Sequence, residues 1–286
     1  MDPVTRLGVV GCGLMGSGIA EIAVRSGIDV RVAEATLDAV EAGRRRLTAS
    51  LDRGVRRGKL SEEQRDQALA RLSFTSDLAE LADRQFVVEA VAENRDIKTD
   101  VLRALDKTVE DPEAILATNT SSIPIVDLAV ATERPGQVIG MHFFNPVPVQ
   151  RLVELIPALT TSPETVQRTR GFAEQLRKEP IEAPDRSGFV VNALLVPYLL
   201  SAVRMLEAGS ARPDDIDRGM ELGCAHPMGP LRLLDLIGLD TAQSVAESMY
   251  EEFKEPLHAP PALLRRMVAA GHLGRKSGRG FYTYDA

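Results

Sequence analysis

The sequence predicts an α/β fold, in which a Rossmann-like, mostly parallel sheet domain is followed by an all-helical C-terminal domain. Short β-rich segments alternate with longer amphipathic segments through the first half of the chain, which is the pattern of parallel βαβ units. A GxGxxG motif begins directly after the first short segment. After Gly188 no convincing strand pattern occurs until the tail. These three observations together predict the two-part fold.

The elements of the first half are predicted from their periodicity and from the residues at their ends. Strands are expected at residues 7–10, 30–33, 86–92, 114–118, 138–144 and 152–156. Helices are expected at residues 14–26, 37–57 and 98–109. A further helix should open at Ser61, because Gln64 stands three positions later at capping-box spacing.

The second half reads as helical, at residues 189–208, 213–222, 229–252 and 262–270. We therefore expect an α/β domain at 1–185 and an all-helical domain at 186–286. Segment 189–208 is apolar on most sides, so it should be buried almost all round. Such a helix in a small domain suggests a partner, and a homodimer through the second domain is the simple hypothesis.

Composition limits the class of protein. The net charge of −7 over 286 residues argues against bulk binding of nucleic acid, and no apolar stretch is long enough to span a membrane. Two cysteines support neither a disulfide framework nor a zinc site, and Cys12 could serve packing or oxidant sensing. A strand pattern begins within a few residues of the start, so no secretory leader is expected. These features predict a cytoplasmic protein without a bound metal.

Positive charge is concentrated in one segment of this acidic chain. Between residues 44 and 59 there is one acidic residue, Asp52, and seven basic ones: Arg44, Arg45, Arg46, Arg53, Arg56, Arg57 and Lys59. One interpretation is a solvent-exposed helix face. The other is a docking surface for a polyanionic ligand, and the segment alone does not decide between them.

The glycine motif predicts a dinucleotide site, because it follows a strand and opens a helix. Gly11 permits a tight turn, Gly13 lets the backbone approach a pyrophosphate, and Gly16 lets the helix pack close to the sheet. Leu14 and Met15 begin the helix, whose first N–H groups and positive dipole end favour phosphate. A purely structural glycine turn is the alternative.

Glu34 predicts the choice of cofactor. It ends the second strand, 34 − 11 = 23 residues after the first glycine, where a carboxylate can accept hydrogen bonds from both ribose hydroxyls of NAD. The same carboxylate would repel the 2′-phosphate of NADP. The alternative is an exposed glutamate at a strand end.

Polar residues follow or interrupt several apolar segments. The sequences at residues 119–122 and 142–146 each follow a strand, and ligands bind outside the carboxyl ends of strands in such sheets. Glu154 lies in an apolar strand and Asn192 in an apolar helix start. Either one could be a hydrogen-bonded core group. Their occurrence together behind a nucleotide loop favours an enzyme site.

These segments resemble the 3-hydroxyacyl-CoA dehydrogenase family, and within it the bacterial 3-hydroxybutyryl-CoA dehydrogenases. The resemblance covers nearly the whole chain and is carried by GCGLMGSGIA, VVEAVAEN, ATNTSS, GMHFFNPVPV, LVELI, GFVVN, HPMGPLRLLDLIGLD and GRKSGRGFY. It implies NAD-dependent, reversible oxidation of a short 3-hydroxyacyl-CoA to the 3-ketoacyl-CoA. A Rossmann-like domain followed by a helical dimerisation domain is implied as well.

The resemblance also implies roles for individual residues. His142 is the expected catalytic base and Glu154 pairs with it, while Ser121 and Asn192 hydrogen-bond the reacting end of the substrate. The expected further cofactor contacts are Glu93 and Lys98, on the loop after VVEAVA, with Asn145 and Lys276. The expected coenzyme A and substrate contacts are Ser50 and Arg57, with Lys98 and Ser121. Ala193 stands where relatives have arginine, so no contact by that arginine is expected.

Two other functions fit parts of this pattern. One is a dehydrogenase of the same build that acts on a free hydroxy acid or sugar acid, which would not need the basic segment. The other is a non-catalytic NAD-binding protein, which would not need Ser121, His142, Glu154 and Asn192 together.

Overall fold

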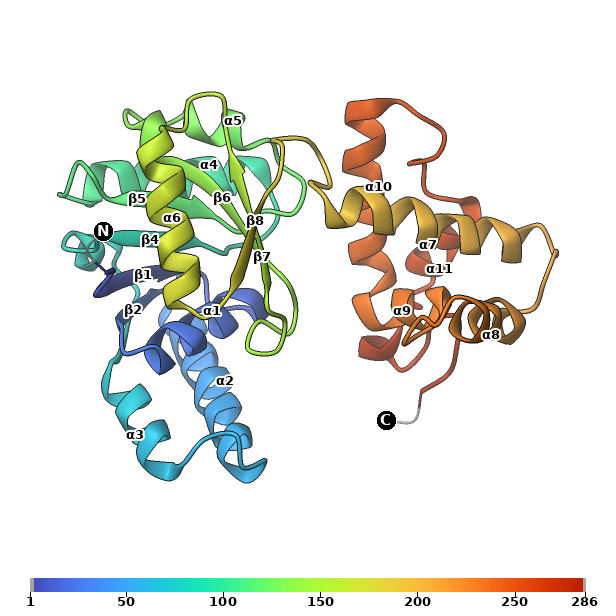
Figure 1. Ribbon diagram of the computed structural model, residues 1–286, viewed down its shortest axis with the longest axis horizontal. Helices are drawn as coiled ribbons and strands as arrows, with labels where there is room; N and C mark the ends of the chain where they lie inside the picture. The colour runs from blue at the N-terminus through green and yellow to red at the C-terminus, as the bar shows by residue number, and fades with distance from the viewer. Residues whose placement is uncertain (1–2, 285–286) are drawn as a thin grey trace. The chain divides into compact units, whose positions relative to one another are not determined.

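The computed structural model describes residues 3–284, and the chain divides between Asp185 and Arg186 into two compact units (Figure 1). The first unit is built on an eight-stranded sheet and the second is helical. The predicted fold class is confirmed.

The sheet has the strand order β3-β2-β1-β4-β5-β6-β7-β8. Its strands are β1 (Arg6–Val10), β2 (Asp29–Ala33), β3 (Leu72–Thr75), β4 (Phe86–Glu89), β5 (Ile115–Thr118), β6 (Val138–Phe143), β7 (Leu152–Pro157) and β8 (Glu179–Glu182). All neighbours run parallel except β6 and β7, which are antiparallel. The order reverses at β1, and this reversal opens a crevice at the carboxyl ends of β1 and β4.

Helices cover both faces of this sheet; in Figure 1, α6 crosses the near face and α4 lies behind it. The helices are α1 (Leu14–Arg25), α2 (Leu37–Arg56), α3 (Glu62–Ala70), η1 (Leu78–Leu81), α4 (Arg95–Thr108), α5 (Ile125–Ala129), η2 (Pro135–Gln137) and α6 (Pro163–Gln175). The predicted capping box is confirmed, because Ser61 accepts from the backbone of Gln64 while the Gln64 side chain accepts from that of Ser61.

Six elements of the first unit were not predicted: β3, β8, α6, α5 and the short helices η1 and η2. Strands β3 and β8 form the two edges of the sheet, and their short sequences, LSFT and EPIE, lack a strong apolar pattern. Helix α6 begins at a proline after the N-cap Ser162, whose hydroxyl accepts from Thr165. The strand predicted at 86–92 ends at Glu89, and Lys98 lies in helix α4 rather than on a loop.

The second unit contains α7 (Val191–Glu207), α8 (Pro213–Gly223), α9 (Pro230–Ile237), α10 (Leu239–Phe253), α11 (Ala262–Ala269) and η3 (Arg275–Ser277). The single helix predicted at 229–252 is wrong, because Gly238 has a φ of 101° and separates α9 from α10. The tail is fixed by the buried Asp235, which accepts from the backbone of Phe281 and Tyr282.

Helix α7 is less covered than predicted. Val196, Leu200 and Val203 are buried, whereas Leu194 is 75% and Met205 is 48% exposed. The expectation of burial all round is therefore wrong within one chain, because the small unit packs against only part of the helix.

Among the helices of residues 3–284, none combines the length and apolar character that a membrane span requires.

Candidate active site

The glycine loop has the geometry that a bound dinucleotide requires. Gly11 has a φ of 89°, a backbone conformation that favours glycine. A Cβ on Gly16 would lie 1.8 Å from the Gly11 carbonyl oxygen, so Gly16 lets helix α1 approach the end of β1. A Cβ on Gly13 would meet no atom within 4 Å, so the loop is open on that side. No described side chain caps α1, which leaves its first N–H groups for a phosphate.

A cavity of about 540 Å³ adjoins this loop at the carboxyl ends of β1, β2 and β4. Gly11, Gly13 and Glu34 contribute to its lining, together with apolar side chains such as Leu78 and Ile97. The Glu34 carboxylate also accepts a hydrogen bond from the Cys12 backbone N–H at 2.5 Å. Glycine loop, carboxylate and apolar wall are the features that an adenosine diphosphate group needs, so the chain's own residues fit NAD.

His142 and Glu154 form a buried pair. They are directly opposite each other in the antiparallel register of β6 and β7, so their side chains share one face of the sheet. His142 Nδ1 lies 2.7 Å from Glu154 Oε2, and the two residues are 5% and 0% exposed. Phe144 contacts the imidazole edge-on, with ring centroids 4.7 Å apart. A carboxylate at Nδ1 fixes the orientation of the imidazole ring.

Glu93 fixes the loop that carries Ser121. One of its carboxylate oxygens accepts from the Thr120 hydroxyl at 2.5 Å and from the Ser121 backbone N–H at 2.8 Å. The Ser121 hydroxyl itself bonds to no described residue, so it can donate to a ligand. Asn119 accepts from the Phe143 backbone N–H at 2.9 Å, which ties this loop to the end of β6.

Glu93 also contacts Lys98, which forms a buried ion pair with Glu89. Lys98 Nζ lies 2.8 Å from Glu89 Oε1 and 3.4 Å from Glu93 Oε2, and Lys98 and Glu89 are 1% and 0% exposed. Thr118 also donates to Glu89, at 2.6 Å. Sequence reasoning missed Glu89 and Thr118, whereas Asn119 lies in the 119–122 segment that it had singled out. The signal for Glu89 was the one that identified Glu154, a carboxylate in an apolar strand.

The remaining predicted site residues lie elsewhere. Asn192 is in α7 of the second unit. Lys276, also in that unit, forms an ion pair with Asp240 at 2.6 Å. Asn145 is exposed on the loop after β6, and its peptide bond to Pro146 is cis. Ser50 lies in α2 and Arg57 is its C-cap residue.

The basic segment has members of two kinds. Arg46 donates to the Cys12 carbonyl at 2.5 Å and Arg44 stacks over the Phe74 ring, so these two serve the packing of α2. Arg53, Arg56 and Arg57 form no ion pair with any described residue and remain exposed. This second group, like the exposed Arg45 and Lys59, is available for a docking surface. No group of three potential metal ligands occurs among residues 3–284.

The sheet topology, the glycine loop and the buried histidine–carboxylate pair define a dinucleotide-dependent oxidoreductase of the Rossmann type. Two family models match the chain: "3-hydroxyacyl-CoA dehydrogenase, NAD binding domain" over residues 6–186 and "3-hydroxyacyl-CoA dehydrogenase, C-terminal domain" over residues 188–284. The chain therefore belongs to the 3-hydroxyacyl-CoA dehydrogenase family, and its first unit carries that family's NAD-binding domain.

Individual relatives agree with this assignment. The chain is 56% identical to a 3-hydroxybutyryl-CoA dehydrogenase of Mycobacterium tuberculosis (strain ATCC 25618 / H37Rv) over 99% of both chains. Its structure matches the crystal structure of M. tuberculosis FadB2 with a TM-score of 0.98 at 56% identity, over 99% of this chain and 100% of that one. It matches the (S)-3-hydroxybutyryl-CoA dehydrogenase PaaH1 from Ralstonia eutropha with a TM-score of 0.94 at 45% identity, over 99% and 100% of the chains.

Proposed function

We propose that this chain catalyses the NAD-dependent, reversible oxidation of a short-chain 3-hydroxyacyl-CoA, with 3-hydroxybutyryl-CoA and acetoacetyl-CoA as the preferred pair. The observation that carries the proposal is the buried His142–Glu154 pair, 2.7 Å apart, with His142 near the carboxyl end of β6. The relatives named for 3-hydroxybutyryl-CoA match the chain from end to end, which supports the choice of substrate.

His142 acts in this proposal as the general base for oxidation and the general acid for reduction. A neutral imidazole can take the proton of a hydroxyl group and return it in the reverse reaction. The proton arrives at Nε2, because Nδ1 faces Glu154. Glu154 holds the ring in this orientation and stabilises the imidazolium that forms. Bound NAD supplies the acceptor for the hydride that leaves C3 of the substrate.

Ser121 and Asn192 are proposed to hold the substrate. The Ser121 hydroxyl would donate to the substrate oxygen, and Glu93 fixes the backbone from which that hydroxyl extends. Correct placement of this kind lowers the barrier because the C3–H bond must point at the nicotinamide. Lys98, Asn145 and Lys276 are proposed as further contacts to cofactor or substrate.

Three broader assignments belong to the same proposal. Ser50 and Arg57 contact coenzyme A, with Arg53 and Arg56 on the same helix end. The protein forms a homodimer through its helical unit, which is supported by the exposed Leu194 and Met205 of α7. It works in the cytoplasm.

The two members of the pair provide the test. His142→Gln keeps size and some hydrogen bonding but removes proton transfer, so kcat should fall by about 10²- to 10⁴-fold with little change in NADH affinity. Glu154→Gln should lower kcat as well. The double variant should lose less than the product of the two effects, because the residues act as one unit. A near-normal kcat for His142→Gln would refute the mechanism, and fully multiplicative losses would remove Glu154 from it.

A further inference from the structure

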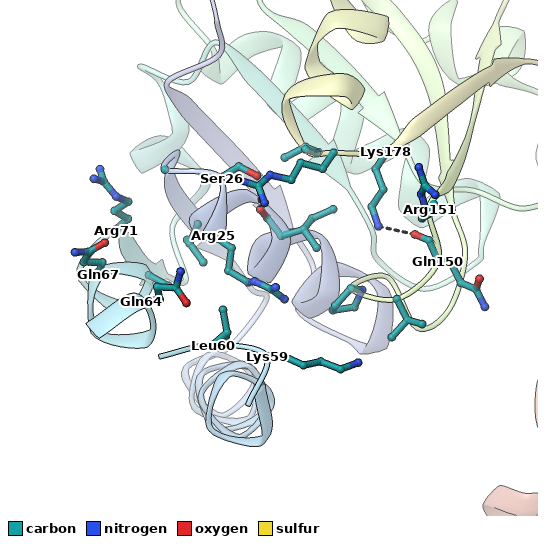
Figure 2. Close-up of a pocket in the computed structure, with 18 residues that line it drawn as sticks. Arg25, Ser26, Lys59, Leu60, Gln64, Gln67, Arg71, Gln150, Arg151 and Lys178 are labelled. Carbon is teal, nitrogen blue, oxygen red and sulfur yellow. Dashed lines mark hydrogen bonds between the residues drawn. The ribbon is translucent and has the colours of Figure 1, made fainter. Parts of the chain in front are cut away.

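A second cavity lies in the first unit, away from the glycine loop and the His142–Glu154 pair. Its volume is about 390 Å³, and it shares no lining residue with the dinucleotide cavity. It is bounded by the end of α1, the α2–α3 turn with one side of α3, the β6–β7 loop and the α6–β8 turn. Figure 2 shows Arg25, Lys59 and Lys178 extending toward this space from three of these segments.

The lining of this cavity is strongly basic. The basic residues are Arg25, Lys59, Arg71, Arg151, Arg177 and Lys178, and no described lining residue is acidic. Arg25 and Arg151 have carboxylate partners just outside the lining, Glu21 and Glu179. The other four make no ion pair with a described residue, so most of the positive charge is uncompensated.

Lys178 shows how this charge is held in place. It is 7% exposed, and its Nζ donates to the carbonyl oxygens of Val147 and Gln150, which are neutral partners. Burial lowers the pKa of its ammonium group, and the nearby Arg25 lowers it further. The fold thus holds two cations near each other at the cost of their mutual repulsion.

The ends of helices explain only part of this arrangement. Arg25, Arg71 and Arg177 stand at the C-terminal ends of α1, α3 and α6, where a cation complements the helix dipole. Each such end carries about half a negative charge, so three ends offset less than two of the positive charges. Lys59 follows the C-cap residue of α2, and its backbone N–H donates to the Gly54 carbonyl, so it stands at a fourth helix end. Four ends offset only about two charges, fewer than the four basic residues without a described ion pair, so a positive surplus remains.

We propose that this cavity binds a phosphate group of a small anionic molecule, with Lys59, Arg177 and Lys178 supplying the charge and Gln64 and Gln150 the polar contacts. Its volume lies within the usual range for small-molecule sites, about 300–1,000 Å³. Two sources of phosphate fit this site: the nucleotide end of coenzyme A, since Lys59 belongs to the basic segment, or a separate phosphorylated metabolite.

Titration with inorganic pyrophosphate tests the site. The full chain, saturated with NADH so that the glycine loop is occupied, is titrated by calorimetry at low ionic strength. The variant Lys59→Gln/Arg177→Asn removes two exposed cations, and asparagine tolerates the φ of 59° at position 177. Binding should weaken by about tenfold, because each exposed charge contributes modestly. The control, Arg103→Gln/Lys107→Gln on α4, removes the same charge and should bind as the unmodified protein does.

Absence of binding to the unmodified protein, or equal weakening in both variants, would overturn the proposal. The source of the phosphate follows from a repeat with saturating coenzyme A. If coenzyme A displaces pyrophosphate and Lys59→Gln/Arg177→Asn raises KM for acetoacetyl-CoA, the cavity extends the substrate site; this arm rests on the proposed function. If pyrophosphate still binds and KM is unchanged, the ligand is a separate metabolite. The titration measures pyrophosphate binding without turnover. Its outcome can therefore be interpreted even if the chain does not catalyse the proposed reaction.

Discussion

At the residue scale, Glu34 serves two purposes that one substitution can separate. Its carboxylate accepts from the Cys12 backbone and stands at the cavity beside the glycine loop. Glu34→Gln keeps an acceptor oxygen but removes the charge that would repel a 2′-phosphate. The ratio of kcat/KM for NADH to that for NADPH should therefore fall by about tenfold, the effect of about 1.4 kcal/mol.

The control for this measurement is Asp38→Asn, which removes an equal charge from the exposed first turn of α2. It should leave the cofactor ratio unchanged. An unmodified protein that uses NADPH as efficiently as NADH would contradict the role of Glu34.

Cys12 and Cys224 should differ sharply in reactivity. Burial, and then the Glu34 charge, raises the pKa of the Cys12 thiol to about 12, although Arg46 acts in the opposite direction. A raised pKa keeps the thiol protonated at pH 8, and the thiolate is the nucleophile. Iodoacetamide at pH 8 should therefore modify the exposed Cys224 and spare Cys12, as judged by peptide mass spectrometry. Equal labelling of both residues would restore the interpretation of Cys12 as an oxidant sensor.

Single residues were predictable where a polar side chain interrupts an apolar strand, as Glu154 does. Glu89 carries the same signal, but its partner Lys98 is nine positions away and lies on a helix, a distance that no local pattern encodes. Asn119 acts through the backbone of Phe143, which side-chain chemistry alone does not reveal. Residue types were thus easier to identify than the contacts between them.

At the scale of elements, the Glu89–Lys98 pair joins β4 to α4. Lys98→Met leaves the Glu89 charge buried without its cation, which should lower the free energy of unfolding by about 3–5 kcal/mol in urea denaturation. The double variant Glu89→Gln/Lys98→Met should recover most of that loss. Arg103→Met removes a cation from the exposed pair with Asp100 on the same helix and should cost under about 0.5 kcal/mol. Equal losses of unfolding free energy for Lys98→Met and Arg103→Met would show that the buried pair stabilises the fold no more than the exposed pair does.

The end of α2 should bind the nucleotide part of coenzyme A. Replacing Arg53, Arg56 and Arg57 by glutamine should raise KM for acetoacetyl-CoA by about tenfold at low salt, and the difference should shrink at high salt because exposed charges are screened. Arg103→Gln/Lys107→Gln serves as the control and should leave KM unchanged. An unchanged KM in the α2 variant would show that these arginines only form a solvent-exposed helix face.

Elements were predictable where end signals and periodicity agree, as at the capping box of Ser61. They were missed at the sheet edges, because an edge strand such as β8 is covered less and tolerates proline and charge. The break at Gly238 was also missed, since an isolated glycine is tolerated within a helical pattern and only its φ of 101° reveals the turn.

At the scale of the whole molecule, composition and motif order were sufficient to predict an α/β unit followed by a helical one. The arrangement of strands was not, because the antiparallel β7 and the edge positions of β3 and β8 depend on pairings between distant segments. The burial of α7 within one chain was overestimated. An apolar sequence pattern does not show which of its residues the rest of the same chain covers. Leu194 and Met205 stay exposed in the single chain, and the proposed homodimer is expected to cover them.

In the proposed function, this chain reduces a 3-ketoacyl thioester with NADH. The most direct test compares the oxidation of NADH in the presence of acetoacetyl-CoA with that in the presence of free acetoacetate at equal concentration. We expect efficient turnover of acetoacetyl-CoA, at least about 10³-fold lower kcat/KM for acetoacetate because the coenzyme A contacts are lost, and loss of the activity in His142→Gln. Equal or better turnover of the free acid, or no turnover of acetoacetyl-CoA, would contradict it.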